Sequence, residues 1–184
     1  SACINTDVIN VIVNPPVVAN AGTDITVCPG FNATLNGNGG GTYNWFPSLG
    51  LNNPNISNPV ASPISSTTYT LVVATGNCTD TDFVSMTVSP QPVVNAGPDI
   101  SICLGNAATL NATGTGAFSW SPSTGLSCTA CANPIANPTS LSTYTVTITD
   151  ANTCISADSI TVTVNPLPLP NAGPKPGWVC PGFG

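Results

Sequence analysis

The sequence predicts an all-β protein built from two tandem antiparallel β-sandwich domains, and three observations lead to this prediction. Runs such as "TYTLVVAT" from Thr68 and "SITVTVN" from Ser159 alternate between apolar and polar residues and are rich in β-branched and aromatic types, which is typical of half-buried strands. No stretch has helical periodicity. The chain also repeats itself almost completely, so each domain is expected to come from one repeat.

The repeat is fixed by matching segments. "NAGTDITVC" returns as "NAGPDISIC", and "TYTLVV" returns as "TYTVTI". The first-strand cysteines, Cys28 and Cys103, are separated by 103 − 28 = 75 positions, and the last-strand cysteines, Cys78 and Cys154, by 154 − 78 = 76. The two complete repeats are residues 17–92 and 93–168.

Both ends of the chain match parts of a repeat. "ACINTDVINVIVNP" resembles the last strand of each repeat, and "PNAGPKPGWVCPGFG" resembles the opening. We therefore expect residues 1–16 and residues 169–184 to be exchanged or exposed terminal strands, each at a junction with a neighbouring molecule. Homologous ends would also result if the chain were a window cut from a longer tandem array, and this alternative stays open.

Each repeat has about seven candidate strands at the spacing of a sandwich. In the first repeat the clearest are expected near residues 25–28, 33–36, 42–46, 69–74 and 82–88. Trp45 and Trp120 alternate with aromatic neighbours two positions earlier, so each indole is expected to face the core. Tyr69 and Tyr144 lie in "TYT" segments, where a tyrosine corner would fall.

Four features taken together resemble the PKD-like and Ig-like repeats of large secreted bacterial surface proteins. These are Trp-x-Pro-x-x-Gly-Leu, Asn-Pro-x-Ala-x-Pro, Thr-Tyr-Thr and an aspartate-bearing last strand, and the resemblance covers essentially all of the chain. It implies a β-sandwich fold, a cell-surface or extracellular location, and roles in stalks, spacers, adhesion or filaments. Fold-level likeness does not decide among these roles.

Charge is unusually sparse in this chain. Only 4% of its residues are charged, against about 25% in ordinary soluble domains. Lys175 is the one basic residue, beside seven aspartates and no His, Glu or Arg. Nucleic acid is therefore excluded as a partner, as is binding to a membrane through basic residues. The usual acid–base groups are missing, so we expect a protein that is not an enzyme and has no cofactor.

Eight cysteines without histidine favour disulfides in an oxidising compartment over zinc. Within a repeat the natural pairs are Cys28–Cys78 and Cys103–Cys154, because the first and last strands lie side by side in many sandwiches. Closing a loop of about 50 residues would stabilise a repeat by roughly 4 kcal/mol in the chain-entropy model.

Cys128 and Cys131 form the segment "CTAC". A thioredoxin-like role would need a βαβ context, which the sequence does not have, and zinc would need two further ligands. We therefore expect a local structural disulfide.

The remaining pair is Cys3 and Cys180. Cys3 aligns with the last-strand cysteines and Cys180 with the first-strand cysteines. Within one chain they should be too far apart to bond, since a disulfide needs Cα atoms within about 7 Å. Between chains, Cys180 of one copy could bond Cys3 of the next, and such a head-to-tail contact builds a filament. In a longer array they would instead pair with flanking domains.

The aspartates and the Asn-x-Ser/Thr sequons are the remaining candidate sites. Asp24 and Asp99 follow "NAG", and Asp82 and Asp158 lie four residues after last-strand cysteines. Calcium needs six to eight oxygens, so hydrogen bonding at turns and strand ends is favoured over any metal site. The possible glycosylation sites are Asn32, Asn55, Asn111 and Ser159.

These observations favour a structural subunit of an extracellular bacterial filament whose partners are copies of itself, with possible glycans on its surface. One alternative is a stalk or spacer in an array of adhesin repeats. A second is a carbohydrate-binding module, for which only Trp178 is a plausible exposed ring.

Overall fold

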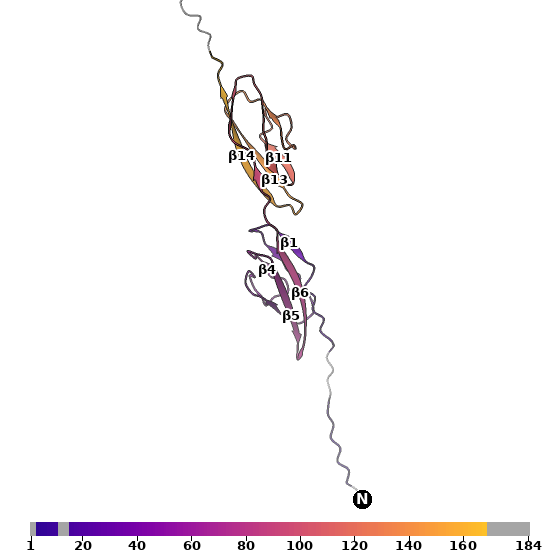
Figure 1. The fold of residues 1–184 in the computed structure, drawn as a ribbon. Helices are drawn as coiled ribbons and strands as arrows, with labels where there is room; N and C mark the ends of the chain where they lie inside the picture. Colours follow the sequence, from indigo (N-terminus) through magenta and orange to yellow (C-terminus); the bar gives the residue numbers. More distant parts are fainter. Residues whose placement is uncertain (1–2, 11–14, 169–184) are drawn as a thin grey trace, which may run out of the picture. The chain divides into compact units, whose positions relative to one another are not determined.

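The computed structural model describes residues 3–10 and 15–168 (Figure 1). All the regular elements in these residues are strands, and none of the described residues forms a helix long and apolar enough to cross a membrane. Two compact units are distinguished. Unit 1 comprises the described residues up to Pro92 together with Thr149–Ile155, and unit 2 comprises Val93–Ile148 and the described residues from Ser156 onward.

Unit 1 is built on a four-stranded sheet in the order β1-β6-β5-β3, and β5 and β6 are labelled side by side in Figure 1. β6 is antiparallel to β5, and β5 is antiparallel to β3, whereas β1 runs parallel to β6. A small antiparallel pair, β2-β4, lies outside this sheet. The bounds are β1 Ile25–Val27, β2 Ala33–Thr34, β3 Thr42–Phe46, β4 Val60–Ala61, β5 Thr67–Thr75 and β6 Cys78–Val88.

The second repeat forms the equivalent sheet, in the order β11-β13-β14-β8, with β8 parallel to β14. Two short antiparallel pairs accompany it, β10-β7 and β12-β9. The bounds are β7 Val94–Asn95, β8 Ile100–Cys103, β9 Ala108–Thr109, β10 Thr113–Gly114, β11 Ala117–Ser121, β12 Ile135–Ala136, β13 Ser142–Thr149 and β14 Ile155–Asn165.

Each repeat has its own apolar core between the larger sheet and the short pairs. In the first, Trp45, Tyr69 and Leu71 are completely buried, and in the second Tyr144 and Val146 hold the matching places. The alternation of buried and exposed positions along β5 and β13 is the period of two expected for a strand with one face on a core. The prediction of two all-β sandwich domains is confirmed.

The strand positions agree with the sequence except at their ends. β3 has the expected bounds, whereas β5 and β6 are longer than expected and β2 is shorter. The direction of the first strand differs from the expected antiparallel arrangement, because β1 and β8 run parallel to the last strands of their repeats. That direction determines where the cysteines lie.

The buried aromatic residues are anchored by backbone acceptors. The indole N–H of Trp45 donates to the Ile56 carbonyl at 3.0 Å, and that of Trp120 donates to the Cys131 carbonyl at 2.9 Å. The Tyr69 and Tyr144 hydroxyls donate to carbonyls 20 residues earlier in the chain. A tyrosine corner bonds only a few residues upstream, so these tyrosines join the start of β5 or β13 to the loop after the Trp strand instead.

Candidate functional site

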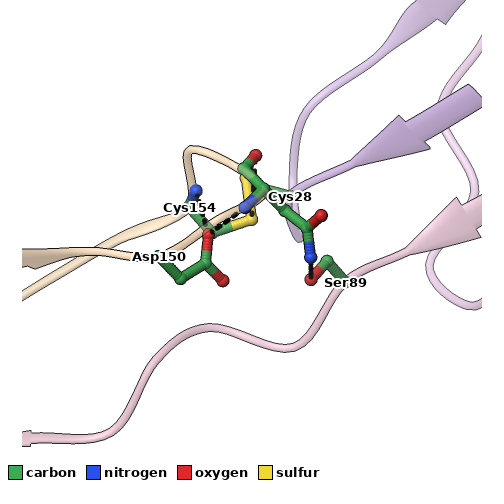
Figure 2. The surroundings of a disulfide bond; sticks show 5 residues. Cys28, Ser89, Asp150 and Cys154 are labelled. Carbon is green, nitrogen blue, oxygen red and sulfur yellow. Dashed lines mark hydrogen bonds between the residues drawn. A yellow bond between two sulfur atoms is a disulfide. The ribbon is translucent and has the colours of Figure 1, made fainter. Parts of the chain in front are cut away.

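The most informative site is a disulfide between Cys28 and Cys154 (Figure 2). Cys28 follows β1, and Cys154 lies in the tip of the β13–β14 hairpin, which groups with unit 1. Their Cα atoms are 5.4 Å apart, an ordinary separation for a disulfide. The bond therefore joins the first-strand cysteine of one repeat to the last-strand cysteine of the next.

The expected pairs within a repeat, Cys28–Cys78 and Cys103–Cys154, are wrong in this structure, and the parallel register explains why. Val27 is paired with Val88, so Cys28 lies beyond the end of β6, whereas Cys78 begins that strand. β6 has 11 residues, and at about 3.3 Å per residue its two ends are roughly 33 Å apart. The first and last strands are neighbours, as expected, but their cysteines lie at opposite ends of the domain.

The second repeat has the same arrangement. Cys103 is paired with Asn165 at the end of β14, whereas Cys154 immediately precedes the start of that strand. Cys103 is exposed and carries a free thiol, as does the half-buried Cys78. Both are cysteines whose equivalents in the other repeat are bonded.

The hairpin tip that carries Cys154 is shaped by Asp150 (Figure 2). Its carboxylate accepts the backbone N–H groups of Asn152 and Cys154, each at 2.8 Å. Thr153 has a φ of 65°, a left-handed conformation that is uncommon outside glycine. The tip is therefore held by bonds to a carboxylate although it contains no glycine.

A side-chain contact accompanies the disulfide. The Asn152 amide donates to the Ser89 hydroxyl at 2.9 Å, and the Ser89 N–H donates to the Val27 carbonyl at 2.8 Å. Ser89 is only 5% exposed, so its hydroxyl is satisfied at a site that water hardly reaches. Sequence reasoning missed both residues, and the available signal was the extra residue that changes the repeat offset from 75 to 76 before Cys154.

The aspartates near the strand ends hold backbone N–H groups. Asp82 accepts from Ala21 and Asp158 from Ala96, each at 2.8 Å. The Ala96 N–H, and then that of Ser159, hold the pKa of the Asp158 carboxyl below its ordinary value.

In the opposite direction, the carboxylates that follow "NAG" accept from the last strands. Asp24 accepts the Ser85 N–H at 2.9 Å and Asp99 the Thr161 N–H at 2.7 Å. The last strand and the segment before the first strand are thus held by reciprocal bonds in both repeats. The described residues contain no cluster of three potential metal ligands, and each of these four carboxylates has a backbone partner.

Cys128 and Cys131 are bonded to each other, with Cα atoms 6.1 Å apart. They close the loop whose Cys131 carbonyl accepts the Trp120 indole. The disulfide therefore holds the loop that anchors a buried core residue, which favours a structural role for it.

The other expected sites are divided between described and undescribed parts of the chain. The four candidate glycosylation sites are all exposed: Asn32, Asn55, Asn111 and Ser159. Cys3 is exposed with a free thiol, whereas Lys175, Trp178 and Cys180 lie outside the described residues.

No protein-family model matches the sequence, and a search of curated proteins finds no relative. Among solved structures, extracellular domains 3–5 of Drosophila OTK match with a TM-score of 0.45 and 12% identity, covering 78% of this chain and 59% of that one. The Ig1 and Ig2 domains of DIP-gamma match with 0.40 and 12%, covering 82% and 98%. The insect immune protein hemolin matches with 0.43 and 15%, covering 79% and 46%. The fold assignment rests on the strand order described above.

Proposed function

We propose that this chain is a non-catalytic structural subunit of an extracellular bacterial filament. Its copies would join head to tail through residues 1–16 and 169–184, with an intermolecular disulfide between Cys180 and Cys3. The observation that supports this best is the Cys28–Cys154 bond. It combines a first-strand with a last-strand cysteine, and Cys180 and Cys3 belong to those same two classes by alignment.

Two further features support assembly outside the cell. Disulfides persist in oxidising compartments, and this chain has two in its described residues. A chain with a single basic residue has few charged groups with which to solvate its surface. Association through backbone strand pairing needs no charged side chains, and it would also cover part of that surface.

The second candidate is a stalk or spacer segment in a longer array of adhesin repeats. One observation favours it, because the Cys28–Cys154 bond joins consecutive repeats of a single polypeptide. The carbohydrate-binding reading has no such support, since Trp45 and Trp120 are buried in the cores.

Denaturing mass analysis of native material, with and without reductant, tests the proposal. A filament subunit gives a ladder that collapses to the 18.4 kDa chain on reduction. A single much larger polypeptide under both conditions would contradict the filament and support the stalk.

A further inference from the structure

Two free cysteines in the described residues have bonded equivalents in the other repeat. Cys78 is the last-strand cysteine of the first repeat, as Cys154 is of the second. Cys103 is the first-strand cysteine of the second repeat, as Cys28 is of the first. In the structure one disulfide joins a first-strand cysteine to a last-strand cysteine. Cys78 and Cys103 each belong to one of these two classes and carry a free thiol.

The surroundings of Cys103 match those of Cys28. Each lies at the end of a first strand that runs parallel to the end of a last strand. A polar residue stands at that end in both repeats: Ser89 beside Cys28, and Asn165 beside Cys103. Backbone hydrogen bonds join the two strands at this end in both repeats: the Ser89 N–H donates to the Val27 carbonyl, and the Leu104 N–H donates to the Asn165 carbonyl, each at 2.8 Å. The exposed Cys103 thiol thus lies at the same end of its parallel strand pair as the bonded Cys28.

Cys78 likewise lies where Cys154 lies, at the tip of the hairpin between the last two strands of its repeat. Thr75 and Cys78 are paired across the β5–β6 hairpin, so only Gly76 and Asn77 form its loop. Asn77 is exposed and provides this tip with an amide, as Asn152 does for the tip that reaches Ser89.

Neither thiol has a partner within its own repeat. The last-strand and first-strand cysteines of a repeat lie at opposite ends of an 11-residue strand, roughly 33 Å apart at about 3.3 Å per residue. A disulfide needs Cα atoms within about 7 Å. The complement of each thiol must therefore come from a different repeat.

We propose that Cys103 of one copy of this chain bonds Cys78 of a second copy, which repeats the Cys28–Cys154 bond between molecules. This inference rests on the proposed head-to-tail assembly and adds a second covalent link to it. The two thiols lose two protons and two electrons as the S–S bond forms. A small-molecule disulfide such as glutathione disulfide accepts them and leaves as two thiols. Because the bond that the structure shows joins a first-strand to a last-strand cysteine, we expect Cys103–Cys78 bonds rather than Cys103–Cys103 or Cys78–Cys78 bonds.

The test uses the full chain with Cys3→Ser and Cys180→Ser, so that the proposed terminal bond cannot form. The protein is incubated in a mixture of reduced and oxidised glutathione and analysed without reductant. We expect a ladder that lengthens with protein concentration and disappears on reduction. Digestion with chymotrypsin, followed by mass spectrometry, should recover Cys78 joined to Cys103, with Cys28–Cys154 intact.

Matched variants determine whether the pairing is specific. In the same background, adding Cys78→Ser or Cys103→Ser should leave each protein monomeric, with the dimer reduced to background. Mixing these two variants should restore a dimer and nothing larger. The inference would be overturned if either variant formed homodimers. It would also be overturned if the parent protein, which carries only Cys3→Ser and Cys180→Ser, stayed monomeric with the Cys78 and Cys103 thiols still reactive toward a thiol reagent. If the unsubstituted chain still forms a ladder through Cys180–Cys3 when the parent does not, the filament proposal stands and this inference fails.

Discussion

The two repeats differ in the loop whose backbone carbonyl accepts the indole N–H of the buried tryptophan. In the first repeat the Asn53 side chain accepts the Asn55 N–H at 3.0 Å, and the loop presents the Ile56 carbonyl to Trp45. In the second repeat Cys128 and Cys131 occupy the positions of Asn53 and Ile56. A hydrogen-bonded turn in one repeat and a disulfide in the other therefore hold equivalent carbonyl acceptors. Comparing the two repeats shows how much each kind of bond in this loop contributes to stability.

The largest expected effect comes from removing the indoles that both loops support. We expect Trp45→Ala and Trp120→Ala each to destabilise their own repeat by about 3–5 kcal/mol, because each creates a cavity. Each also leaves a carbonyl acceptor without its donor. Urea unfolding followed by far-UV circular dichroism measures each loss, and with Trp178→Phe as the common background the fluorescence of the remaining core Trp shows whether the other repeat keeps its own midpoint. A loss confined to one variant would contradict the view that the two cores are equivalent.

The loops themselves are compared next. Replacing Cys128 and Cys131 with serine opens a four-residue ring, for which the chain-entropy relation gives about 2 kcal/mol. Asn53→Ala removes one hydrogen bond, for which we expect about 1 kcal/mol. Thermal unfolding of both variants measures the difference. Equal losses would mean that the covalent bond adds nothing beyond the turn it replaces.

The two tyrosines should respond alike to alkali. Burial raises the pKa of Tyr69 and of Tyr144 above the ordinary value of 10.0. The folded state therefore favours the neutral phenol, its stability is unaffected below pH 10, and it declines as the pH rises further, because the unfolded chain ionises first. Denaturant midpoints between pH 8 and pH 11 check this, with Tyr69→Phe and Tyr144→Phe as controls. Each control should flatten the decline for its own repeat.

The smallest effect is expected in acid. The pKa of Asp158 is lowered by the N–H groups of Ala96 and Ser159, so its carboxylate stabilises the fold at neutral pH. That stabilisation is lost as the pH falls below 3.8 through the lower folded pKa. Thermal unfolding of the wild type and of Asp158→Asn should therefore converge at low pH. A difference that persists unchanged into acid would show that the carboxylate charge is not involved.

Much of the fold could be predicted because it depends on local periodicity. The alternation in "TYTLVVAT" and the inward register of Trp45 both follow from a period of two, and the matching segments divide the chain into repeats. Strand direction has no such local signature. The residues of β1 give the same pattern whether the strand runs parallel or antiparallel to β6, so the sequence places the cysteines on the correct strands but predicts the wrong partners for them.

The hairpin contact was hidden for a different reason. Asn152 and Ser89 are 63 positions apart, and neither residue type is distinctive in a chain rich in Asn, Ser and Thr. Their bond depends on where the tip of a long hairpin lies, and that position follows only when the whole sheet has formed. The hydrogen bonds that Asp82 and Asp158 accept from backbone N–H groups were easier to anticipate, since the spacing of these aspartates from the cysteines recurs in both repeats.

The Cys28–Cys154 bond also has a mechanical meaning. A pull on the two ends of the chain passes along β1 to Cys28 and across the disulfide to Cys154, so the residues between these two cysteines, β6 among them, carry no tension. The disulfide therefore shields the first repeat from extension while it is intact. Reduction of the bond would transfer the load to the parallel β1–β6 pair, whose hydrogen bonds would then be sheared together because the two strands run in the same direction.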